Sequence, residues 1–87
     1  MKGQVALVRE QGVEFAVVVV KRHVLNSPSQ RDEAVQAFSI EFGRPAVLMA
    51  QDSRGVPTYH GRRDIVRFLQ NVLPEQLPWR EFAMRAA

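Results

Sequence analysis

The strongest constraint on the fold of this chain is a strand-like stretch that is apolar on both of its faces. Val13 to Lys21 is the stretch richest in β-branched residues, and its length and composition favour a strand over a helix. Its side chains alternate between the faces, with Phe15, Val17 and Val19 on one and Ala16, Val18 and Val20 on the other. Ala46 to Gln51 shows the same pattern. Because a sheet with one face in water alternates apolar and polar residues, we expect both faces to be covered.

Three arrangements would account for the second face of the sheet. The C-terminal segment, residues 74–87, is too apolar for a free tail and would pack on the domain formed by residues 1–73 or on a partner. A second copy of the chain would cover the face in a homodimer. A central strand with small exposed valines is the third arrangement. The segment is punctuated by Pro74 and Pro78 and carries Leu77, Trp79, Phe82 and Met84. The candidate interface residues are Val18, Val20, Leu77, Trp79 and Phe82.

Hydrophobic periodicity and turn residues predict two hairpin-plus-helix units. The expected strands span residues 5–10, 13–21, 46–51 and 56–60, and the expected helices span residues 28–42 and 62–72. Ser27 is the expected N-cap of the first helix, and Gly43 is its expected end. Pro57 has no N–H for a strand ladder, so its strand is expected at an edge or a bulge.

The order ββαββα predicts an α+β fold, with a four-stranded, mostly antiparallel sheet and both helices packed on one face. The segment from the second strand to the last helix resembles the end of a thioredoxin-like fold. The shared features are a proline before a strand, a tight hairpin and a glycine before the last helix. The Cys-x-x-Cys redox pair is absent, so the resemblance implies a topology and no redox activity.

Length and composition indicate a small, single-domain, cytoplasmic protein. The 87 residues are 46% apolar and 24% charged, which is typical of a globular chain. There is no cysteine, so disulfides and sulfur-ligated zinc are excluded. The N-terminus lacks the features of a signal peptide. The longest apolar run, Phe15 to Val20, is far shorter than the roughly 20 residues of a membrane helix, so no membrane partner is expected.

Basic residues provide the candidate contacts for an anion or a nucleic acid. The net charge is +3, with 12 basic and 9 acidic residues interspersed, and no long basic run is present. The candidates are Lys21, Arg22, Arg54, His60, Arg62 and Arg63. The alternative is structural: Asp64 pairs with Arg67 one turn along the helix, and the other arginines are solvated.

No motif in the sequence indicates catalysis, a metal or another cofactor. A triad can be written on paper from the two histidines and from a set of serines and aspartates, but no spacing or nucleophile motif supports one. The set is Ser27, Ser29, Ser39, Ser53, Asp32, Asp52 and Asp64. The two histidines have no carboxylates at ligand spacing. We therefore expect a non-enzymatic protein-interaction module that binds itself as a homodimer or another protein. The alternative is a nucleic-acid or phosphate-binding domain with an arginine-rich edge.

Overall fold

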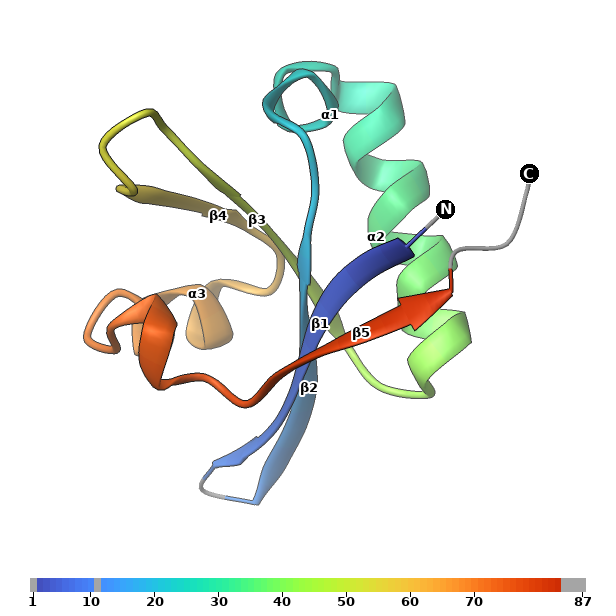
Figure 1. Ribbon diagram of the computed structural model, residues 1–87. Helices are drawn as coiled ribbons and strands as arrows, with labels where there is room; N and C mark the ends of the chain where they lie inside the picture. Colours follow the sequence, from blue (N-terminus) through green and yellow to red (C-terminus); the bar gives the residue numbers. More distant parts are fainter. Residues whose placement is uncertain (1, 11, 84–87) are drawn as a thin grey trace.

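The computed structural model describes residues 2–10 and 12–83, whose strands form a five-stranded mixed sheet (Figure 1). The strands are β1 (Lys2–Glu10), β2 (Val13–Val19), β3 (Ala46–Gln51), β4 (Pro57–His60) and β5 (Trp79–Ala83). Their order is β4-β3-β2-β1-β5, with β2 and β3 parallel and the other neighbours antiparallel. The α+β class is confirmed. The prediction of four mostly antiparallel strands is wrong, because a fifth strand joins the edge and a central pair is parallel.

Within the described residues, three α-helices and one 3₁₀ turn connect the strands. They are α1 (Arg22–Asn26), α2 (Pro28–Phe42), α3 (Arg63–Leu69) and η1 (Pro74–Gln76). The predicted limits of α2 are confirmed: the Ser27 hydroxyl accepts from the Gln30 amide at 3.5 Å, and Gly43 ends the helix at φ 65°. The short helix α1 was not predicted. It begins directly after the expected end of the second strand, which itself stops two residues early, at Val19.

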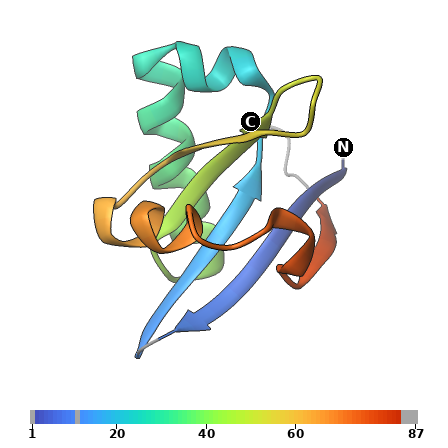
Figure 2. The same cartoon turned by 90° about the vertical axis from the view of Figure 1, so that its left-hand side faces the viewer.

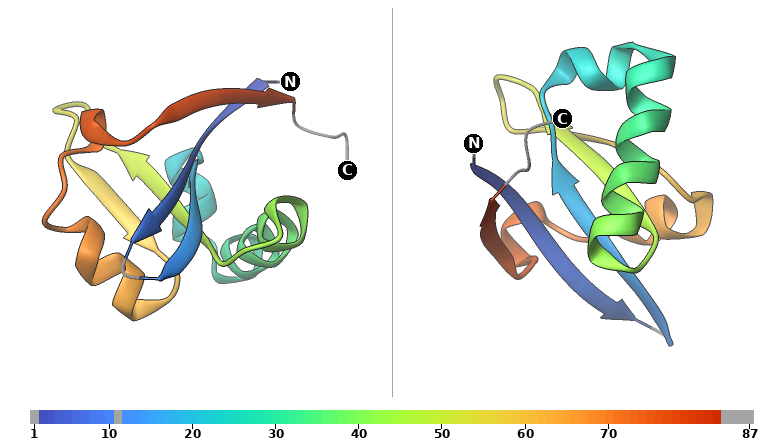
Figure 3. Two further views of the ribbon diagram at one scale, coloured as in Figure 1. Left: turned by 90° about the horizontal axis from the view of Figure 1, so that it is seen from below. Right: turned by 90° about the vertical axis from the view of Figure 1, so that its right-hand side faces the viewer.

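The helices lie on opposite faces of the sheet, so the prediction of both helices on one face is wrong. α3 and η1 cross the strands in Figure 2, whereas α1 and α2 cross them in the right panel of Figure 3. Ile65 and Leu69 of α3 pack with Val17 and Val47, whereas Phe38 of α2 packs on the opposite set of strand side chains. The parallel β2–β3 pair needs a crossover connection, which α1 and α2 form on one face, and α3 packs on the other face.

The C-terminal segment completes the cover of both faces. Leu77 is buried in the α3-side core, and the Trp79 indole Nε1 donates to the Pro74 carbonyl at 2.7 Å. On the other face, the Phe82 ring lies edge-to-face on Phe42, with ring centroids 5.2 Å apart. The expected apolar second face is therefore real, and this single chain covers it. Met84 lies outside the described residues.

The candidate interface residues lie in this internal packing. Val18 is fully buried and Leu77 is 7% exposed. Val20, Trp79 and Phe82 are half-buried and pack against the core clusters. An uncovered sheet face therefore no longer supports homodimerisation. The homodimer itself is not tested by these contacts and stays a prediction.

Among the described residues, no helix has the length and apolar character to cross a membrane. The chain passes from β2 through helices to β3, β4 and α3, which is the stretch that the thioredoxin-like resemblance concerned. That resemblance stays a prediction.

Candidate binding groove

A groove runs between α2 and the connection from β4 to α3. Its volume is about 400 Å³. The apolar part of its lining is Val35, Pro45, Ala46 and Gly61, and the polar part is Asp32, Gln36, Ser39, His60 and Arg62. A concave, partly apolar surface with a few polar groups is the usual form of a binding site. We call this surface the α2–β4 groove.

Ser39 fixes the base of the α2–β4 groove. Its hydroxyl donates to the Val35 carbonyl at 2.6 Å and accepts from the Ala46 amide at 3.0 Å. The first bond lies within α2, and the second joins the last turns of α2 to the start of β3. The Ala16 amide also donates to the Pro45 carbonyl at 2.9 Å, which attaches the same corner to β2. The helical wall of the groove is thus held at a fixed position on the sheet.

Gly61 allows the opposite wall to approach closely. A Cβ atom at this position would lie 2.9 Å from Val47 Cγ2, 3.1 Å from Val47 Cα and 3.2 Å from the Ala46 carbonyl oxygen. The last two neighbours are backbone atoms, which cannot rotate away. A glycine is therefore required here by space, and it lets the chain turn out of β4 directly against β3.

His60 and Asp32 face each other across the groove. His60 Nε2 lies 3.9 Å from Asp32 Oδ1, and the two side chains are 35% and 76% exposed. Burial lowers the pKa of the His60 imidazole below its ordinary 6.5; the Arg31 charge lowers the same pKa further, and Asp32 partly offsets both effects. The lowered pKa favours the uncharged form of the His60 ring. The charged groups that act on it are the Arg31 guanidinium and the Asp32 carboxylate.

Ser39, His60 and Asp32 share this groove, yet they do not form a catalytic triad. The Ser39 proton is directed to the Val35 carbonyl at 2.6 Å. The 3.9 Å separation of His60 from Asp32 exceeds a hydrogen bond. A serine nucleophile needs a base that accepts its proton and a third group that orients the base. Neither interaction is present in this arrangement.

Arg62 at the rim is held by Asp64. The Arg62 Nε and Nη2 atoms donate to the two Asp64 carboxylate oxygens at 2.8 and 2.7 Å. This bidentate pair lowers the pKa of Asp64 to about 2 and raises the pKa of Arg62. The predicted pairing of Asp64 with Arg67 is therefore wrong. Arg62 has extended backbone before the helix, so its side chain reaches Asp64 two residues along.

The six predicted basic contacts form two groups rather than one surface. Lys21 and Arg22 begin α1 after the end of β2, and Arg54 lies in the β3–β4 turn, at the same end of the sheet. Asp52 shapes that turn, since its Oδ1 accepts from the amides of Arg54 and Val56 at 2.8 and 3.0 Å. His60, Arg62 and Arg63 lie at the other end of β4, and only His60 and Arg62 line the groove.

Most of the groove lining was not predicted as a site. Asp32, Gln36 and Ser39 recur at helical spacing, which gives α2 a polar edge that the sequence could have revealed. Arg31, whose charge acts on His60, has no sequence pattern that indicates a site. Its Nε is buried without a hydrogen-bond partner among the described residues.

Comparison of the chain with protein-family models, with curated proteins and with solved structures finds no match.

Proposed function

We propose that this protein is a non-enzymatic protein-interaction module and that the α2–β4 groove receives an extended segment of its partner. The observation that carries the proposal is the groove itself, whose lining combines apolar residues with polar and oppositely charged ones. Grooves of this composition suit peptide recognition, in which apolar contacts give affinity and polar groups fix the register.

Three features of the fold support the α2–β4 groove, rather than a face of the sheet, as the binding site. Both faces of the sheet are occupied by the chain's own helices and C-terminal segment. The Ser39 hydrogen bonds and the Gly61 contact hold the two walls in fixed positions, which lowers the ordering cost of binding. The Ser39 hydroxyl donates its proton to the Val35 carbonyl rather than to a base, which favours binding over catalysis.

Selection from a displayed library of random peptides tests the proposal. The wild-type protein is expected to enrich peptides that a Gln36→Trp variant binds at least about tenfold more weakly, since the indole would fill the groove. Glu33→Trp is the matched control, because Glu33 is exposed on the same helix but does not line the groove. Enrichment of no peptide, or of peptides that bind the Gln36→Trp variant as well as the wild type, would contradict the proposal.

A second candidate function is phosphate or nucleic-acid binding at the other end of the sheet. Lys21, Arg22 and Arg54 are exposed there, and none forms an ion pair with a carboxylate in the described part of the chain. Free basic side chains at one end of a protein attract phosphates, with an affinity that falls with salt.

Fluorescence anisotropy with labelled RNA and duplex DNA tests this second candidate across a salt series. The Arg22→Gln/Arg54→Gln variant is expected to bind more weakly and with a shallower salt dependence. Arg9→Gln/Arg80→Gln removes the same net charge elsewhere on the surface and should bind like the wild type. Equal weakening in both variants would indicate binding through net charge alone and would contradict a site at this end.

A further inference from the structure

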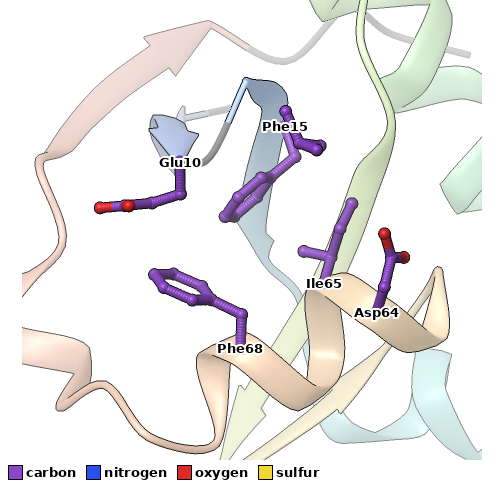
Figure 4. Close-up of a pocket in the computed structure, with 6 residues that line it drawn as sticks. Glu10, Phe15, Asp64, Ile65 and Phe68 are labelled. Atoms are coloured by element: carbon purple, nitrogen blue, oxygen red, sulfur yellow. The ribbon is translucent and has the colours of Figure 1, made fainter.

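A smaller hollow lies on the opposite face of the sheet, between the β1–β2 hairpin and α3 (Figure 4). Its volume is about 130 Å³, which is the scale of a single side chain. Its lining is Glu10, Val13, Phe15, Asp64, Ile65 and Phe68. It shares no lining residue with the α2–β4 groove and belongs to a different surface.

Two aromatic rings form the apolar part of the hollow. The rings of Phe15 and Phe68 meet edge-to-face, with centroids 6.1 Å apart and planes at 73°. Phe15 and Ile65 are buried, whereas Phe68 is half-buried and keeps part of its ring open. In Figure 4 the Glu10 side chain lies across from the two rings, and its carboxylate points outward, away from them.

The ionisable groups of the hollow are both carboxylates, although the chain as a whole carries a net charge of +3. Asp64 is already neutralised by its bidentate bond to Arg62. Glu10 forms no ion pair within residues 2–10 and 12–83. The uncompensated negative charge is therefore at the Glu10 end of the hollow, on its outer side.

We propose that this hollow receives an arginine or lysine side chain of a protein partner, with its alkyl stem on Phe15 and Phe68 and its cationic head at Glu10. Long basic side chains bury their stems on apolar surfaces while the charged head stays near water. The open part of the Phe68 ring adds an attraction for the cation. A neutral apolar side chain would bring no partner to the Glu10 carboxylate, and an acidic one would be repelled by it.

A methyl- and aromatic-detected NMR titration tests this inference. The probe is Nα-acetyl-arginine amide, and the controls are the amides of acetyl-citrulline and acetyl-norleucine, which keep a long side chain without the charge. Arginine is expected to shift the signals of Ile65 and Phe68 at millimolar concentration and to bind about threefold more tightly than either control. Glu10→Gln should abolish that preference. Glu33→Gln, which removes an exposed carboxylate of α2, should not.

Several results would overturn the inference. Norleucine binding as tightly as arginine would show an apolar anchor site, and an unchanged preference in Glu10→Gln would remove the role of that carboxylate. The absence of shifts at Ile65 and Phe68 on addition of the arginine probe would also contradict the inference. Shifts confined to His60 and Gly61 would place the binding in the α2–β4 groove and contradict the inference in the same way. Glu10 is exposed, so its variant should keep the fold, and far-UV circular dichroism checks this. The outcome does not depend on the peptide selection, which concerns the α2–β4 groove.

Discussion

Replacing Leu69 by alanine should remove much of the stability of the domain. Leu69 is fully buried in the core between α3 and the sheet. The change deletes three carbon groups, which at about 0.8 kcal/mol each correspond to about 2.4 kcal/mol of lost transfer free energy. The cavity that remains raises the expected loss to about 3 kcal/mol, within the roughly 2–5 kcal/mol seen for buried leucines. Domains of 87 residues unfold with about 4–13 kcal/mol, so the loss is a large fraction of the total.

Urea unfolding, followed by circular dichroism and by the fluorescence of Trp79, measures this loss. Leu73→Ala is the matched control, because Leu73 is four positions further along and 58% exposed. It should change the free energy of unfolding by no more than about 0.5 kcal/mol. Leu69→Met keeps most of the volume and should lose less than about 1.5 kcal/mol. If Leu69→Ala and Leu73→Ala were equally stable, α3 would not cover the sheet as described.

Three further predictions follow from individual contacts. Gly61→Ala should lower the free energy of unfolding, measured in urea, by about 1–3 kcal/mol. Adding Val47→Ala to this variant should relieve only part of the clash, because two of the three close neighbours are backbone atoms. Tyr59→Phe should raise the free energy of unfolding by up to about 1 kcal/mol, since the Tyr59 hydroxyl is buried without a hydrogen-bond partner among the described residues. Carbon-detected NMR titration of Asp64 should give a pKa of about 2, and Arg62→Ala should move it toward 3.8.

The lowered pKa of Asp64 also makes the stability of the fold depend on pH. Because its pKa is lowered in the folded state, the Asp64–Arg62 pair stabilises the fold above pH 3.8, and this stabilisation is lost as the pH falls toward 2. The Arg62→Ala variant should lack that part of the pH dependence. An Asp64 pKa that is the same in the wild type and in Arg62→Ala would contradict the bidentate pair. A Tyr59→Phe variant with a lower free energy of unfolding than the wild type would show that the Tyr59 hydroxyl has a hydrogen-bond partner.

The parts of the fold that depend on neighbouring residues could be predicted from the sequence. The limits of α2 follow from a capping serine and a C-terminal glycine, which act within one helical turn. The edge position of β4 follows from Pro57, which lacks the N–H that an inner strand would need. The demand for cover on both faces follows from the alternation in β2.

The routing of α3 and the strand β5 could not be predicted in the same way. Nothing in α3 itself distinguishes one apolar face of the sheet from the other, since both accept an apolar stripe. In β5, Trp79 and Phe82 are three residues apart and point to opposite faces, so the segment shows no alternation. The candidate groove was missed for a related reason: His60 and Asp32 are 28 positions apart, and only tertiary packing brings them to 3.9 Å.

The central claim is that the chain closes both faces of its own sheet, with α2 on one side and α3 on the other. Methyl–aromatic nuclear Overhauser effects on the monomeric protein test it most directly. The predicted result is contact between Val17 and the methyl groups of Ile65 or Leu69, together with contact between Val18 and the Phe38 ring. Contacts from Val18 to Leu69, or no contact from α3 to Val17, would contradict the claim.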